Sequence, residues 1–157
     1  MVYSYMQSPV GKLLLAGDEA GLKWIRFPGE EPGQEPESGW KASSDLLKDA
    51  IEQIRAYFEG ERQTFSLKLA PQATPFQGKV LQALIEIPYG ETRSYGELAG
   101  QIGNPRASRA VGGACARNPI PIVIPCHRVI GAKGSLTGFG GGLDVKEALL
   151  SLEQRYL

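Results

Sequence analysis

Cysteine and histidine are scarce in this chain of 157 residues, which has two cysteines and a single histidine. Cys115 and Cys126 lie eleven residues apart, a spacing that fits no C-x-x-C redox motif. Three soft ligands are too few for a tetrahedral zinc site, so we expect neither a bound metal nor a cofactor. Hydrophobic residues make up 42% of the chain, enough for a core without disulfides, and both thiols are expected to stay reduced.

Long apolar runs are equally scarce. No stretch approaches the roughly 18 apolar residues that a membrane span requires. The N-terminal segment Met1–Gln7 alternates between apolar and polar residues, and it lacks the charged start and apolar core of a signal peptide. The sequence therefore predicts a cytoplasmic protein with no membrane partner.

The chain has no excess of either charge, because 17 basic residues balance 17 acidic ones. The distribution is uneven, however, since six Lys or Arg residues between Thr92 and Lys133 face only one acidic residue, Glu97. Such a basic segment can attract a polyanion through counterion release, although solvated segments of this kind are common. Charge alone leaves both interpretations open.

The first part of the chain has the pattern of a small antiparallel sheet. Short alternating segments between turn-forming residues predict strands over 2–7, 12–16 and 22–27, and one more over 65–69. Pro28–Gly39 is rich in glycine, proline and glutamate, has almost nothing to bury, and is predicted to be a mobile acidic loop. From Ser44 onward, apolar residues from Leu46 to Phe58 recur with helical spacing and predict a helix that ends at Gly60.

The rest of the chain is predicted to be mainly helical. Capping-box patterns mark three helix starts, at 74–77, 94–97 and 144–147. After the second start, Gly103-Asn104-Pro105 turns the chain from a short helix into another that runs from Arg106 to about Arg117. Two helices joined by a tight turn form a helix-turn-helix pattern, which binds DNA in some proteins and nothing in many others.

The predicted helix 106–117 is unusually rich in small residues. The consecutive Gly112 and Gly113 each cost roughly 1 kcal/mol relative to alanine in a helix interior, and Val111 is the one large apolar residue. Small side chains let a helix backbone come close either to a nucleic-acid groove or to a neighbouring helix. The composition does not separate these two partners. Cys115, in the same helix, is predicted to be a small buried hydrophobe.

The segment Ile124-Pro125-Cys126-His127-Arg128-Val129 sets a cysteine beside the only histidine. A thiol reacts as the thiolate, and a free thiol with a pKa of roughly 8.5 needs a base or a positive charge nearby. His127 and Arg128 could supply these, so Cys126 is a candidate nucleophile; the alternative is a buried structural cysteine beside a surface histidine. Prolines in the apolar segment 120–125 exclude a helix, and we expect this segment to carry Cys126 to the base of a pocket.

A glycine-rich loop follows, with six glycines between Gly131 and Gly142. Glycine permits tight turns and a close approach of backbone N–H groups to a ligand. The spacing matches neither the phosphate-binding P-loop nor the dinucleotide-binding motif. After the loop, inward-facing Leu149, Leu150 and Leu152 predict a final helix.

Taken together, these segments resemble the methylated-DNA-[protein]-cysteine methyltransferases, or O6-alkylguanine-DNA alkyltransferases. The resemblance rests on Arg109–Ala114, Asn118-Pro119, Ile124–Val129 and the glycine-rich loop, and it covers about residues 74–153. Ser8–Gly11 and Tyr57–Gly60 are more loosely similar to the N-terminal domain of that family.

The resemblance implies an α+β fold with two domains. A ribonuclease-H-like antiparallel sheet with a helix would occupy residues 1–72. A mainly helical, winged-helix-like domain with a helix-turn-helix would occupy residues 73–157, bind DNA and accept the alkyl group. Some members hold zinc in the N-terminal domain, but the Cys and His ligands are missing here, so zinc is not expected.

The resemblance also implies DNA repair by a single-turnover transferase. Cys126 would accept the alkyl group from O6 of a guanine, and O4-alkylthymine is a further candidate substrate. His127 would act as a base through a bridging water, and Glu153 would orient its imidazole. Tyr95 would donate a hydrogen bond to guanine N3, and Asn118 would tie the helix 106–117 to the active-site segment.

For the extruded base, the resemblance implies recognition mostly by backbone groups. The carbonyls of Cys126 and Val129 and the amide of Gly140 would read the guanine edge, and Phe139 would form a pocket wall. Some relatives have tyrosine and serine where this chain has Phe139 and Gly140, so the hydrogen bonds of those hydroxyls are not expected here.

For the duplex, the resemblance implies binding in the minor groove. Arg109 would fill the gap left by the flipped nucleotide, while Ala107, Ala110 and Gly112 would let the helix lie in the groove and Ser94 would contact DNA from the preceding helix. The expected partner is double-stranded DNA containing O6-alkylguanine, bound by a monomer.

Two other functions remain open at this stage. A non-enzymatic alkyltransferase-like protein would bind the lesion without repairing it, but such proteins replace the acceptor cysteine, and Cys126 is present. A helix-turn-helix regulator would need a base-reading second helix, whereas 106–117 offers mostly alanine and glycine.

Overall fold

The computed structural model describes residues 1–30, 32–134, 136 and 138–157. Glu31, in the predicted acidic loop, and Ser135 and Thr137, in the glycine-rich loop, lie outside the described residues. The chain forms two compact units, Met1–Gln72 and Ala73–Leu157. The predicted α+β class is confirmed, because the first unit contains a mainly antiparallel sheet with a helix and the second is mainly helical.

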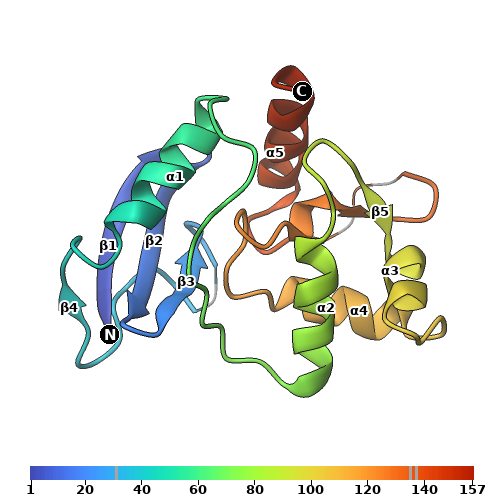
Figure 1. Cartoon of the computed structure of the whole chain (residues 1–157), viewed down its shortest axis with the longest axis horizontal. Coiled ribbons are helices and arrows are strands. Elements are labelled where there is room, and N and C mark those ends of the chain that lie inside the picture. Colours follow the sequence, from blue (N-terminus) through green and yellow to red (C-terminus); the bar gives the residue numbers. More distant parts are fainter. Residues whose placement is uncertain (31, 135, 137) are drawn as a thin grey trace. The chain divides into compact units, whose positions relative to one another are not determined.

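The sheet of the first unit has the strand order β3-β2-β1-β4 (Figure 1). The antiparallel strands β1 (Val2–Ser8), β2 (Gly11–Asp18) and β3 (Gly21–Arg26) match the three predicted near the N-terminus, and the short β4 (Lys41–Ala42) pairs in parallel with β1. Leu13–Ala16 have no exposed surface, so the central strand β2 is covered on both faces.

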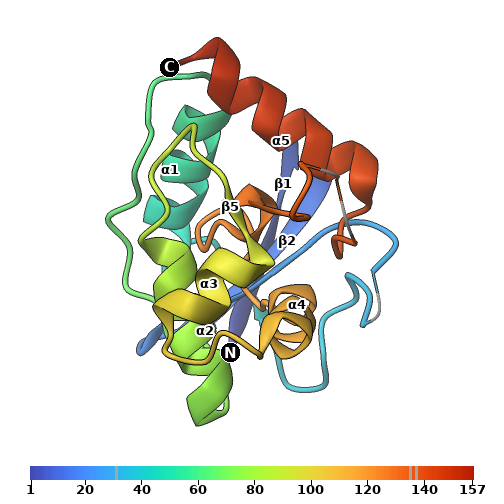
Figure 2. The same ribbon diagram turned by 90° about the vertical axis from the view of Figure 1, so that its right-hand side faces the viewer.

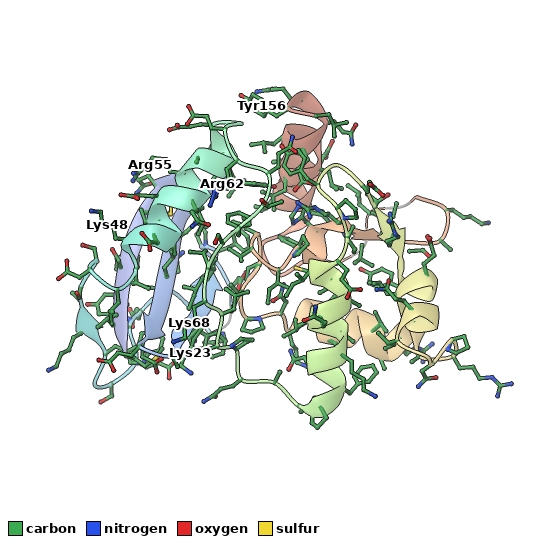
Figure 3. The ribbon with its side chains drawn as sticks, in the orientation of Figure 1. Lys23, Lys48, Arg55, Arg62, Lys68 and Tyr156 are labelled. Carbon is green, nitrogen blue, oxygen red and sulfur yellow. The ribbon has the colours of Figure 1, made fainter. Side chains whose placement is uncertain are left out.

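Helix α1 (Lys48–Phe58) lies across one face of this sheet (Figure 1). Ile54 and Tyr57 point into the core, whereas Lys48 and Arg55, seven residues apart, lie on the exposed side of the helix (Figure 3). The helix begins later than predicted, so Leu46 precedes it and stays 55% exposed instead of joining the apolar face. Gly60 follows the helix with φ of 78°, which fits its predicted role at the helix end.

The strand predicted over 65–69 is wrong. Only one isolated parallel bridge forms, between Leu22 and Leu69, where Leu22 N–H donates to the Lys68 carbonyl at 2.9 Å and Ala70 N–H donates to the Leu22 carbonyl at 2.8 Å. Lys23 and Lys68 accordingly lie near each other in Figure 3. The alternating pattern of residues 65–69 therefore predicted an extended segment, but a single residue of this segment, Leu69, forms a bridge with β3.

The acidic loop Pro28–Gly39, predicted to be mobile because it has almost nothing to bury, makes polar contacts with the sheet through several of its described residues. Buried Arg26 donates to the Gly33 carbonyl at 3.2 Å and pairs with Glu37 at 3.0 Å, and its guanidinium lies over the ring of Trp24 at 4.7 Å. Gln34 donates to the Lys12 and Arg26 carbonyls at 2.6 and 2.8 Å. Polar contacts thus replace the apolar burial that the loop lacks.

The second unit contains four helices and a small parallel ladder among its described residues (Figure 2). The helices are α2 (Pro75–Ile85), α3 (Tyr95–Gln101), α4 (Ser108–Ala116) and α5 (Leu143–Arg155), and the ladder pairs β5 (Arg93–Ser94) with β6 (Val129–Ile130). Gly103, with φ of 82°, makes the turn between α3 and α4. The predicted helix-turn-helix pair is therefore present.

Two of the three predicted helix starts are correct. Ser94 and Glu97 form a complete capping box on α3, and the Thr74 hydroxyl accepts from Gln77 N–H at the start of α2. The third is wrong, because α5 begins at Leu143 and its cap is Gly142, with φ of 96°. Glycine enters the helix from a backbone conformation that aspartate adopts less easily, which places Asp144 inside the first turn.

Candidate active site

The candidate nucleophile lies on an almost completely buried segment, Pro119–Val129, that follows α4. Asn118 brackets this segment: its amide donates to the Ile124 carbonyl at 2.8 Å, and its carbonyl accepts from Ile120 N–H at 3.0 Å. Ile122 has φ of 74°, a rare conformation for a β-branched residue that only tight surroundings maintain. Asn118 thereby fixes the turn that delivers Cys126, which is 6% exposed, to the start of a 3-10 turn, Cys126–Arg128.

His127 and Glu153 form a buried pair across the second unit. His127 Nε2 lies 2.6 Å from Glu153 Oε2, and neither residue exposes more than 1% of its surface. Burial lowers the pKa of His127, and the opposing hydrogen bond and charge of Glu153 do not cancel this effect. Burial alone would raise the pKa of Glu153, but hydrogen bonds from His127 and Arg128 outweigh it and lower the pKa to about 2.

This arrangement determines which histidine nitrogen carries the proton. An ionised carboxylate only accepts hydrogen bonds, so the proton of neutral His127 must lie on Nε2. Nδ1 is then an unprotonated acceptor, and it is buried without a hydrogen-bond partner among the described residues. A bare ring nitrogen on the residue next to Cys126 is what a general base for the thiol requires.

Arg128 does not serve the thiol as the sequence suggested. Its Nε and Nη2 donate to the two oxygens of Glu153 at 2.8 and 3.0 Å, and its Nη1 donates to the Ile87 carbonyl at 2.7 Å. The guanidinium is 5.6 Å from the centre of the Tyr89 ring. Cys126 and Arg128 are close in the sequence, but the 3-10 turn directs the side chain of Arg128 toward Glu153 and Ile87.

Lys146 is the cation that sequence reasoning missed. It has no exposed surface, its ammonium lies 6.0 Å from the centre of the Tyr95 ring, and its charge interacts with both Cys126 and Cys115. Burial lowers the pKa of Lys146, while the two thiols favour its charged form. The helical spacing could have predicted its burial, because Lys146 falls on the same face of α5 as Leu149 and Glu153, and all three are buried.

An open groove of about 630 Å³ brings several predicted site residues together. Tyr95 reaches it from the start of α3, Arg109 and Gly112 from α4, and Phe139 and Gly140 from the glycine-rich loop. An added Cβ at Gly112 would lie 3.8 Å from the Tyr95 ring, so a small residue here keeps α4 close to that ring. Val129 lies in β6 and has no exposed surface, so neither its side chain nor its backbone is open to solvent in this structure.

The predicted DNA-contacting residues differ in exposure. Arg109 and Ala110 are exposed on α4, whereas Ala107 is 9% exposed and gives its carbonyl to Val111 N–H. Ser94 is half-buried, and its hydroxyl accepts from Glu97 N–H at 3.1 Å. Arg109 and Ala110 thus offer a partner more surface than Ala107 does.

Comparison with known families identifies both units. Residues 1–71 match the model of the 6-O-methylguanine DNA methyltransferase ribonuclease-like domain, and residues 75–155 match that of the 6-O-methylguanine DNA methyltransferase DNA binding domain. The chain belongs to the 6-O-methylguanine DNA methyltransferase family. The predicted family and enzyme class are therefore confirmed, and the class is that of a transferase.

Relatives match over nearly the whole chain. A methylated-DNA–protein-cysteine methyltransferase of Methanosarcina acetivorans is 56% identical over 154 residues, 98% of each chain, and one of Mycolicibacterium paratuberculosis is 51% identical over 98% of this chain and 93% of its own. Among solved structures, Mycobacterium tuberculosis OGT in complex with DNA has a TM-score of 0.93 at 47% identity, and the match covers 99% of this chain and 94% of that one.

The second cysteine of this family member is poorly suited to attack. Cys115 is 8% exposed, and burial raises its pKa to about 12, with the neighbouring Cys126 adding to the shift. A thiol with so high a pKa is almost wholly protonated at neutral pH and reacts slowly. Cys126 is buried as well, at 6% exposed, but it lies beside His127 in the chain, so of the two thiols it is the better candidate for the acceptor.

Two absences hold for the residues that the structure describes. Outside Glu31, Ser135 and Thr137, no group of three or more His, Cys, Asp or Glu side chains could hold a metal ion. Over the same part of the chain, no helix is long and apolar enough to cross a membrane.

Proposed function

We propose that this protein repairs DNA by transferring an alkyl group from O6 of guanine in duplex DNA to Sγ of Cys126. The observation that carries the proposal is the buried Nδ1 of His127, which has no hydrogen-bond partner in the part of the chain that the structure describes. His127 follows Cys126 in the chain, and its other ring nitrogen is held by ionised Glu153. Family membership and the similarity to a DNA-bound relative support DNA as the partner.

The proton and the alkyl group move in opposite directions in this mechanism. His127 Nδ1 takes the thiol proton through a bridging water, and the Cys126 thiolate attacks the alkyl carbon in line with the C–O6 bond. A C–S bond forms, the C–O6 bond breaks, and the electron pair stays on the base, which regains a proton and leaves as guanine. Tyr95 donates to N3 as charge develops on the departing base.

The transfer occurs once per molecule. A thioether at Cys126 is chemically stable, and none of the groups placed in this site could displace the alkyl group again. The protein is therefore consumed by its own reaction. O4-alkylthymine, which carries an alkyl group on an equivalent oxygen, is a further substrate under this mechanism.

The base must leave the stack before Cys126 can reach it. Extrusion costs a few kcal/mol and is cheapest for a damaged, weakly paired base. In the proposal, α4 lies in the minor groove with Ala107, Ala110 and Gly112 close to the DNA, Arg109 fills the gap, and Ser94 adds a contact. The side chain of Phe139 and the backbone groups of Gly140, Val129 and Cys126 then hold the base, while Asn118 keeps the active-site segment in place.

This chemistry also defines the setting in which the protein works. Cys126 has to remain a free thiol, which the reducing cytoplasm provides. One acceptor, one extrusion residue and one groove suffice for one lesion, so we expect a monomer to act on double-stranded DNA without a cofactor.

Intact-mass spectrometry after incubation with an O6-methylguanine duplex tests the proposal. The expected result is the mass of one added methyl group, mapped to Cys126, in the wild-type protein and in Cys115→Ala, but not in Cys126→Ala. Cys126→Ala should still bind the duplex. A methyl group on Cys115, or repeated turnover, would contradict the proposal, and tight lesion binding without a mass change would indicate a non-enzymatic binding protein instead.

A further inference from the structure

Glu153 lies in a cage of donors that extends beyond the histidine it faces. Its Oε1 accepts from Arg128 Nε at 2.8 Å and from Gly90 N–H at 3.1 Å, and its Oε2 accepts from His127 Nε2 at 2.6 Å and from Arg128 Nη2 at 3.0 Å. Each carboxylate oxygen thus receives at least two donors. Only one of these four donors belongs to the proposed proton relay.

We propose that Gly90 and Arg128 are positioning residues that hold Glu153 ionised and aimed at His127, and so fix Nδ1 of His127 as the base. The inference rests on the proposed function, which it deepens, because it assigns the groups that set the state of the relay. Neither residue touches the thiol or the substrate in this proposal, and both act through Glu153.

Two features favour glycine at position 90, and the backbone conformation is the stronger of them. Its φ is 79°, which side chains other than asparagine and aspartate rarely adopt, and an added Cβ would run into the side chain of Leu157. Its carbonyl accepts from Gln154 at 2.9 Å while its N–H donates to Glu153. Both backbone groups of Gly90 therefore bind the last turns of α5, and these two hydrogen bonds fix the position of Glu153 relative to Gly90.

Arginine is required at position 128 because the contacts form a fork. Two guanidinium nitrogens bind the carboxylate, while the third binds the Ile87 carbonyl at 2.7 Å, three residues before Gly90. Lysine would keep the positive charge but could not make parallel bonds to two oxygens and a third to Ile87. The segment 87–90 and Arg128 thus support each other around one carboxylate.

The cage explains why a buried carboxylate remains charged. If the donors were removed, burial would raise the pKa of Glu153 and favour its protonated form. A protonated Glu153 can donate a hydrogen bond as well as accept one, so it would no longer keep the proton of His127 on Nε2. Two further titratable groups act on this pair: Tyr89 interacts with Glu153, and Lys146 opposes protonation of His127. If the cage is weakened, we expect the proton of His127 to be shared between the two ring nitrogens.

The single histidine makes this tautomer directly measurable. In protein with a ¹⁵N-labelled imidazole and no histidine tag, the two ring nitrogens give one pair of signals, and an unprotonated nitrogen resonates far downfield of a protonated one. We expect Nδ1 to be the bare nitrogen at neutral pH in the wild type. In Arg128→Lys the two signals should move toward each other as both tautomers become populated.

The same variant should react more slowly at neutral pH. The loss is expected to be about tenfold, below the roughly 10²- to 10⁴-fold that a positioned base contributes. The acidic limb of the single-turnover rate profile should move to higher pH, because the pKa of Glu153 rises when donors are lost. A merely structural role for Arg128 would lower the melting temperature without moving either the tautomer or this limb.

Gly90 is tested in a background that removes the steric conflict with the exposed Leu157. Leu157→Ala alone should react and melt like the wild type. Within it, Gly90→Asn can keep the left-handed backbone and should retain the rate, whereas Gly90→Val cannot and should lose about tenfold with the same change of tautomer. This pair decides the matter even if Arg128 variants fail to fold.

The outcomes separate this inference from the function it deepens. If the wild type transfers no alkyl group but the tautomer responds as described, the proposed function fails and the cage stands. If Arg128→Lys and Gly90→Val both keep the wild-type tautomer and pH profile, the cage has no positioning role, whatever the protein does to DNA.

Discussion

At the scale of single residues, one buried ionic cluster decides the chemistry of Cys126. Glu153 carries a negative charge that Arg128 balances directly, so His127 stays neutral between them and its Nδ1 remains free to accept a proton. The second cation, Lys146, interacts with the thiols of Cys126 and Cys115. In the proposed mechanism, the base that a reactive cysteine needs is therefore His127, and the positive charge comes from Lys146 instead of Arg128.

Replacing Lys146 with methionine should separate activity from stability. Loss of the ammonium beside Cys126 should slow transfer roughly tenfold at neutral pH, which corresponds to one pKa unit in the thiolate fraction. Because burial opposes the charge of Lys146, an apolar side chain of similar length should leave the melting temperature unchanged or raise it. Stopped-flow transfer rates and thermal melts measure the two effects, with the exposed Lys48→Met as the matched control.

A different pattern would assign Lys146 to the fold. If Lys146→Met melts far below the wild type yet reacts at the normal rate when cold, the lysine stabilises α5 through other contacts. Recovery of the rate at higher pH would instead support the electrostatic role, since a thiol without a cation still ionises as the pH approaches roughly 8.5.

At the scale of secondary-structure elements, local signals predicted the helices better than the loops. The helix caps at Thr74 and Ser94 could be predicted because both partners of each capping hydrogen bond lie within four residues. The pattern at Asp144 looked the same, but the backbone of Gly142 started α5 earlier. A sequence shows which residues are able to cap a helix. It does not show which of two nearby residues, here Gly142 or Asp144, will occupy the cap position, because the preceding turn decides this.

Helix α4 carries the prediction that belongs to this scale. Arg109 is exposed on α4 and lines the groove, so we expect it to replace the flipped nucleotide within the duplex. Arg109→Ala should slow repair of an O6-methylguanine duplex by roughly 10- to 100-fold, because extrusion of a base costs a few kcal/mol. Transfer from free O6-benzylguanine, which needs no extrusion, should change little.

The control for α4 is Arg117→Ala, at the exposed end of the same helix and outside the lining of the groove. It should leave transfer from free O6-benzylguanine unchanged and slow repair of the duplex only slightly, through the loss of general electrostatic attraction to DNA. Equal losses with both substrates in Arg109→Ala would place Arg109 in the chemistry or the fold rather than in extrusion.

At the scale of the whole molecule, contacts between distant segments account for most of what sequence reasoning missed. Arg26 anchors the loop that composition alone described as mobile, and Arg128 reaches across 25 residues to Glu153 and 41 residues to Ile87. Neither contact has a local pattern. The motif around Cys126 marked the candidate nucleophile and the family resemblance implied Glu153 as the partner of His127, whereas the contacts of Glu153 with Arg128 and Gly90 had no pattern in the sequence.

The same cluster should make folding depend on pH. His127 and Glu153 both have a lower pKa in the folded protein than in the unfolded chain. The unfolded chain therefore binds more protons in the affected range, and stability must rise with pH there. The contribution of His127 to the free energy of unfolding is fully present above its ordinary pKa of about 6.5 and is lost as the pH falls below that value. The contribution of Glu153 is lost as the pH falls from 4.5 to about 2.

Thermal melts between pH 3 and pH 8, roughly the range in which these two groups titrate, should therefore show a loss of stability on acidification. The share of Glu153 is on the order of 3 kcal/mol, since its pKa falls from 4.5 to about 2. Glu153→Gln cannot titrate, so it should be less stable than the wild type at pH 7 but should lose less below pH 4.5. Parallel curves for the two proteins would show that other carboxylates control acid unfolding and that the ionised Glu153 contributes nothing to it.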